Sequence, residues 1–93
     1  MKTVTAIEKE QITNLKFSAQ EVLHSVEERS LRRADLERAQ ALGNLLQNKV
    51  RIRFETADGE HYEVYTTVWA VGERFIKLKG GVHIPIHCIL KIA

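Results

Sequence analysis

The sequence predicts an α+β protein in which an N-terminal helix is followed by a small, strongly bent antiparallel β-barrel of four or five strands. Two observations lead to this prediction. In the first half of the chain, apolar residues recur every three or four positions, and from Lys49 onward they alternate with polar residues. Asp-Gly and Gly-Gly pairs then divide the second half into segments of strand length.

The chain has 93 residues, enough for one domain with a modest core. Within that domain we expect an N-terminal arm and helical segment over 1–48 and the small barrel over 49–93. With 44% apolar and 28% charged residues, the composition is that of a folded protein. The single cysteine excludes an internal disulfide and favours a reducing, cytoplasmic location. No apolar run approaches the length of a membrane span, and no signal peptide is expected.

The helix start is predicted at Ala19. Ser18 can act as N-cap with Glu21 completing a capping box, and Phe17 and Val22 stand at the positions of a hydrophobic staple.

The predicted helix runs to about Leu42, or to Asn48 if Gly43 is tolerated inside it. A second helix capped by Ser30 is the alternative. For residues 1–16 three structures stay open: a frayed helix, an edge strand from Ile12 into Phe17, or a flexible arm.

The strands are predicted from period-two alternation. A first strand contains Val50, Ile52 and Phe54, and the Asp-Gly turn at 57–60 leads into a long strand over 61–71. A third strand covers 75–79, and Gly80-Gly81 makes the next tight turn.

In the closing segment, Ile84, Ile86 and Cys88 share one strand face, and His83 and His87 share the other. Cys88 is therefore expected to be a small buried hydrophobe. Pro85 cannot donate a ladder hydrogen bond, so it predicts an edge, a bulge or a bend.

A metal or catalytic site is not expected. His83 and His87 on one strand would lie about 13 Å apart, too far to share an ion, and Cys88 points the opposite way. The carboxylates of the second half lie in or beside turns and do not pair as an acid and a base. We therefore predict a protein that is not an enzyme and holds no metal and no cofactor.

The outward strand face carries cations and aromatic rings. Residues 74–93 hold four basic side chains and no carboxylate. Rings among cations suit single-stranded nucleic acid, in which bases stack and phosphates meet cations. The candidate nucleic-acid-binding residues are Arg51, Arg53, Phe75, Lys77, Lys79 and His87. Tyr65 and Trp69 are candidate interface residues, covered by the helix stripe or by another subunit.

After the predicted helix, the chain contains in order VRIRF, DG, a long strand, FIKLKGG and VHIPIHCILKI. This order resembles the Sm/Hfq-like family of small SH3-like β-barrels. The resemblance covers residues 50–92. It implies an oligomeric, ring-forming RNA-binding protein in which Phe75 stacks on a base and His87 is the histidine of the last-strand motif. The chain differs from that family at Pro85 and Ile86, where the family has tyrosine and lysine.

Two functions follow as hypotheses. The first is a binding module for single-stranded RNA that uses the basic and aromatic strand face. The second is a protein-interaction or self-assembly module that binds no nucleic acid. Both are compatible with a homo-oligomer that does not enter a membrane.

Overall fold

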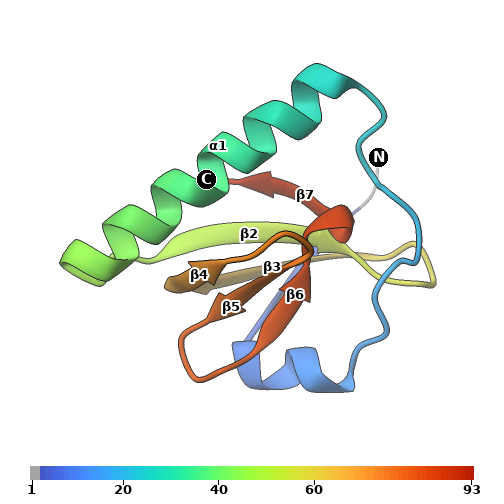
Figure 1. Ribbon diagram of the computed structural model, residues 1–93. Coiled ribbons are helices and arrows are strands. Elements are labelled where there is room, and N and C mark those ends of the chain that lie inside the picture. Colours follow the sequence, from blue (N-terminus) through green and yellow to red (C-terminus); the bar gives the residue numbers. More distant parts are fainter. Residues whose placement is uncertain (1–2) are drawn as a thin grey trace.

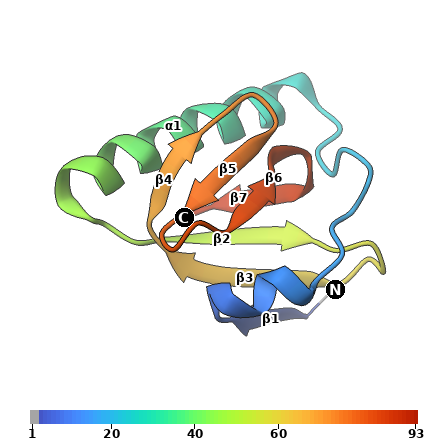
Figure 2. The same ribbon diagram turned by 60° about the horizontal axis from the view of Figure 1, so that its bottom comes forward.

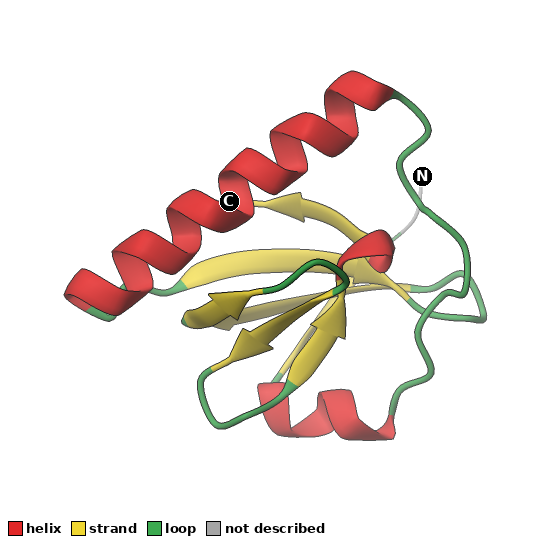
Figure 3. Ribbon diagram, viewed as in Figure 1, coloured by secondary structure: helices red, strands yellow, loops and turns green. Residues whose placement is uncertain are grey.

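The computed structural model describes residues 3–93 as an α+β protein (Figure 1). Its elements are β1 (Val4–Ile7), the 3-10 helix η1 (Lys9–Asn14), α1 (Val26–Leu46), β2 (Val50–Glu55), β3 (His61–Thr66), β4 (Val68–Val71), β5 (Phe75–Leu78), β6 (His83–Pro85), the 3-10 helix η2 (Ile86–Cys88) and β7 (Ile89–Ile92). The α-helix lies along one side of the strands (Figure 3).

The strands form two separate sheets. The first has the order β1-β3-β2-β7 and the second has the order β4-β5-β6. Figure 2 shows β4, β5 and β6 on one side of β2 and β3. All the described pairings are antiparallel except β1 with β3, which is parallel.

The predicted closed β-barrel is wrong. The long strand expected over 61–71 is interrupted at Thr67, so that its first part, β3, belongs to the four-stranded sheet and its second part, β4, to the three-stranded sheet. Helix α1 lies across the open side between the two sheets. Arg32 donates to the Ile89 carbonyl of β7, and Gln40 accepts from the Val71 amide of β4. Side chains of the helix therefore satisfy strand groups that a closed barrel would pair with another strand.

The predicted N-terminal helix is also wrong, since α1 lies mid-chain and starts seven residues later than expected. Its N-cap is Ser25, whose hydroxyl accepts a hydrogen bond from the Glu28 amide. The expected cap fails because its groups bind elsewhere: the Ser18 amide donates to the Glu55 carbonyl, and the Glu21 carboxylate binds Arg32. The residues from Ser18 to Ser25 form a bent connection that is neither helix nor strand.

The chain before the helix contributes an edge strand and a 3-10 helix. Strand β1 pairs with β3 over four residues, and Ile12 of η1 is buried in the core. Of the three alternatives left open for residues 1–16, the edge strand from Ile12 into Phe17 does not form, and Phe17 makes only a single bridge with Thr56.

Both sheets pack on one core. The four-stranded sheet contributes Ile52, Phe54, Val64 and Ile89, the three-stranded sheet contributes Val68, Ile76, Leu78 and Ile84, and Leu36 and Ala39 come from α1. Because these side chains lie between the sheets, the second face of each sheet points away from the other sheet.

The glycine turn, the bend at Pro85 and the burial of Cys88 confirm their predictions, whereas the single last strand that was expected is broken into β6, η2 and β7. Gly80 and Gly81 both have φ near +90°, which glycine adopts without steric cost. Strand β6 is an edge strand, and the chain bends into η2 directly after Pro85. Cys88 is buried, and its thiol donates to the Pro85 carbonyl at 3.1 Å.

Candidate nucleic-acid interface

The structure divides the sequence-derived candidates between two surfaces. Arg51 and Arg53 lie on β2 in the four-stranded sheet, whereas Phe75 and Lys77 lie on β5 in the three-stranded sheet. Since the two sheets enclose the core between them, the single basic and aromatic surface expected from strand parity consists of two surfaces.

The first surface, which we call the Phe75 face, consists of Phe75, Lys77, Lys79 and His83. Lys77 pairs with His83 across β5 and β6, and Phe75 pairs with Pro85. All four residues of the face are exposed, and Phe75 presents 50% of its surface to solvent. Strands β4, β5 and β6 contain no carboxylate. The face therefore combines a free aromatic ring with a local excess of positive charge.

A pocket of about 490 Å³ adjoins Phe75. It is lined by Glu21, Glu73, Arg74, Phe75, Pro85, Ile86 and His87. The pocket thus brings together two of the candidate residues, Phe75 and His87. The imidazole Nε2 of His87 lies 2.6 Å from the Ser18 carbonyl oxygen and donates to it. This bond fixes the ring at the edge of the pocket.

The second surface is the outward face of β2 and β3. Arg51 stands opposite Tyr65 and Arg53 opposite Glu63 in the ladder. The Arg51 guanidinium lies 4.8 Å from the centre of the Tyr65 ring, and Lys49 Nζ lies 5.6 Å from it. These cations already occupy the ring face through cation–π contacts.

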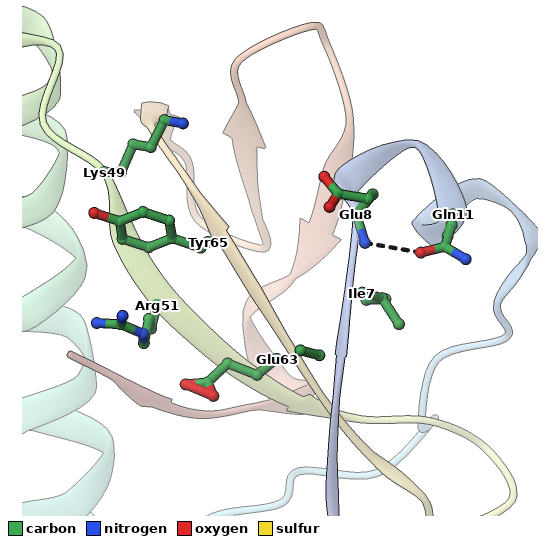
Figure 4. A pocket seen from close by; sticks show the side chains of 8 residues that line it. Ile7, Glu8, Gln11, Lys49, Arg51, Glu63 and Tyr65 are labelled. Carbon is green, nitrogen blue, oxygen red and sulfur yellow. Dashed lines mark hydrogen bonds between the residues drawn. The ribbon is translucent and has the colours of Figure 1, made fainter.

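The same surface contains a pocket of about 410 Å³ between β1, η1 and the ends of β2 and β3 (Figure 4). Its lining is of mixed charge: Glu63 points toward Arg51, and Glu8 lies across the pocket from Lys49 (Figure 4). Carboxylates among the cations reduce the attraction of this surface for a polyanion.

The two candidate interface residues are not buried beneath α1. Tyr65 exposes 55% of its surface and Trp69 exposes 40%. The helix instead covers the edge of β4, where a Cβ atom at Gly43 would lie 2.6 Å from the Val68 carbonyl oxygen. Both rings remain accessible to a partner.

The histidines and the cysteine of the last segment do not converge. His83 is exposed on β6, His87 binds the Ser18 carbonyl, and Cys88 is buried. Burial raises the pKa of the Cys88 thiol to about 12, so this group is a poor nucleophile. Over residues 3–93, no three histidine, cysteine or carboxylate side chains come together to hold a metal ion.

Sequence reasoning missed the ion pair of Arg32 with Glu21. Arg32 stands in a run of charged residues, but its side chain is only 6% exposed. Its two terminal nitrogens each lie 2.7 Å from a carboxylate oxygen of Glu21. The available signal was Leu36, which lies one helical turn after Arg32 on the buried side of α1.

No protein-family model, curated protein or solved structure matches the chain. The helices described over residues 3–93 include none with the length and apolarity needed to cross a membrane.

Proposed function

We propose that the protein is a non-enzymatic module that binds single-stranded RNA on the Phe75 face. The observation that carries the proposal is the pairing of an exposed ring with cations on strands that hold no carboxylate. A base can stack on such a ring while the neighbouring phosphates contact cations, and each stacked base contributes about 1–3 kcal/mol.

The Phe75 ring is available for stacking. Within the described part of the chain no other aromatic ring stacks on it and no cation lies over it. The pocket beside it leaves a base room near Pro85 and His87, and its two carboxylates, Glu21 and Glu73, lie outside strands β4, β5 and β6. Tyr65 is the weaker platform, because Arg51 and Lys49 already lie over its ring.

The cations of the Phe75 face are also free to meet phosphates. Lys77 and Lys79 of this face, and Arg74 beside it, are exposed, and none of them belongs to an ion pair among the described residues. On the opposite sheet, Glu63 stands across from Arg53. Phosphate binding therefore favours the three-stranded sheet.

The test is an anisotropy titration of a labelled single-stranded RNA of about ten nucleotides at low salt. We expect binding by the wild-type chain and a loss of at least tenfold in the double variant K77E/K79E. The matched control is K16E/K49E, which makes the same change in charge beside the other sheet.

When the titration is repeated at about 0.15 M salt, the control is expected to bind within about threefold of the wild type, because a Debye length of about 8 Å leaves only nearby charges effective. Equal losses in the two double variants would mean that net charge, not this face, attracts RNA. No binding by the wild type at low salt would refute the proposal and leave the alternative function, a protein-interaction module.

A further inference from the structure

Helix α1 exposes several leucines to solvent. Leu31 exposes 62% of its surface and Leu45 exposes 79%, and Leu42 and Leu46 are exposed as well. The buried positions of the helix, Arg32, Leu36, Ala39 and Gly43, form a separate stripe along it. A group of exposed leucines on one helix is unusual for a surface that faces only water.

An apolar groove of about 220 Å³ runs between the first half of α1 and β7. Its apolar lining comes from Leu23, Leu31, Leu90 and Ile92, and Glu28, Arg32, Asp35 and Lys91 complete it. Figure 1 shows β7 beside this half of the helix, while the last turn of α1 extends past the ends of β2 and β4. The helix therefore has the groove near its N-terminal end and exposed leucines near its C-terminal end.

We infer that two copies of the chain associate through antiparallel α1 helices related by a two-fold axis near Arg38. Leu31 and Leu45 each lie seven residues from Arg38, so this pairing places Leu31 of one copy opposite Leu45 of the other. Ala34 then faces Leu42 of the second copy, a small residue against a large one. An isologous interface requires such self-complementarity.

The same pairing fills the groove. The leucines at the end of one helix come opposite the positions around Leu31 in the second copy, where the groove lies. The two-fold axis repeats this contact, so both grooves receive leucines and each copy covers its exposed apolar side chains. Burial of these side chains provides the driving force.

The charges at the centre are compatible with the pairing. Arg38 Nη1 lies 2.9 Å from Asp35 Oδ1 within one chain. At the two-fold axis two such pairs adjoin, which gives two positive and two negative side chains with no net charge. Because a single pair of helices covers less than the roughly 800 Å² per partner of a standard interface, we expect dissociation at about 1–100 µM.

Sedimentation equilibrium over a wide concentration range tests the association. The wild type is expected to reach twice the monomer mass, and L45E is expected to weaken the dimer at least tenfold. Val26 is the matched control, since it is an exposed apolar residue on another side of the same helix and V26E leaves the dimer intact. A wild-type monomer at several times the expected dissociation range, or equal effects of the two variants, would overturn the inference.

Disulfide trapping tests the antiparallel geometry separately, in chains whose native Cys88 is buried. A mixture of L31C and L45C chains is expected to form the mixed disulfide on oxidation. Neither variant should cross-link to itself, because Leu31 of the two copies would be separated by about 21 Å along the helix. Self-linking of each variant without the mixed product would indicate parallel helices and contradict the proposal.

Discussion

Arg32 of α1 donates two hydrogen bonds of 2.7 Å to the carboxylate of Glu21. The same guanidinium donates to the Ile89 carbonyl oxygen at 3.0 Å. One side chain thus joins the connection before the helix, the helix itself and the last strand. Because the Arg32 side chain is buried, the Glu21 carboxylate is needed to compensate the cost of burying its positive charge.

The first prediction concerns this ion pair. Glu21→Gln leaves a buried guanidinium without its counter-charge, and we expect the free energy of unfolding to fall by about 1–3 kcal/mol. Urea denaturation measures the change. The control is Glu37→Gln, since the Glu37 carboxylate is largely exposed and lies 3.8 Å from Arg33. That exposed pair should contribute at most about 0.5 kcal/mol.

The pair also predicts how stability depends on pH. Partial burial acts to raise the pKa of Glu21, but hydrogen bonds from Arg32 and from the Leu23 amide, with the charge of Arg32, outweigh it and lower the pKa. A carboxyl group with a lowered folded-state pKa stabilises the fold above its ordinary pKa, and this contribution is lost as the pH falls through the folded-state value. The stability of the wild type relative to Glu21→Gln should therefore shrink below about pH 4.5. A constant difference from pH 7 to pH 3 would contradict this account.

Gly43 gives the second prediction. Alanine normally stabilises a helix interior by about 1 kcal/mol over glycine. At this position the added Cβ would lie 2.6 Å from the Val68 carbonyl oxygen and 3.0 Å from a Thr67 methyl carbon. We expect Gly43→Ala to lower the unfolding free energy by about 1–3 kcal/mol, because the helix must move off β4. Asn44→Ala, at the exposed neighbouring position, should stabilise the protein slightly; similar gains in both variants would disprove the close packing.

Cys88 gives the third prediction. Burial raises the pKa of its thiol to about 12 from an ordinary value of 9.0. A group with a raised folded-state pKa contributes stability fully below its unfolded pKa, and this contribution disappears as the pH rises through the folded-state value. Stability should therefore decline between pH 9 and about 12, and this component should be absent from Cys88→Ala.

Thiol labelling offers an independent measurement of the same group. At pH 8 the native protein should react with a thiol reagent only as fast as it opens, so the rate should rise with urea. Rapid labelling of the native chain would place the thiol at the surface and contradict its burial.

The sequence predicted the strands well because period-two alternation and glycine turns are local signals. Gly80 and Gly81 turn the chain, and Ile84 faces inward as strand parity indicated, whereas Cys88 is buried as expected but lies in the 3-10 helix η2. The helix start was misplaced because the Ser18–Glu21 pattern of a capping box is equally suited to tertiary hydrogen bonds. Leu36, one helical turn after Arg32, indicates that this side of the helix is buried, but only the packed fold provides the partner Glu21.

The division of the candidate site could not be predicted for a similar reason. Strand parity places Arg51 and Lys77 on the side opposite the core, and both are exposed as expected. Parity does not specify which sheet a strand joins, however, and the break at Thr67 assigns β3 and β4 to different sheets. The separation of the cations into two surfaces is therefore a tertiary property.

The fourth prediction separates stacking from charge on the Phe75 face. Phe75→Ala removes the ring, so RNA affinity should fall by about 1–3 kcal/mol while the slope of log K against log salt stays unchanged. Lys77→Gln removes a phosphate contact, so the slope should become shallower by about 0.7. Phe75→Tyr keeps an aromatic ring and should bind nearly as well as the wild type. Titrations at four salt concentrations give both quantities, with circular dichroism to verify folding. If Phe75→Ala altered the slope and left affinity at low salt intact, or if Phe75→Tyr failed as badly as Phe75→Ala, the ring would not be a stacking platform.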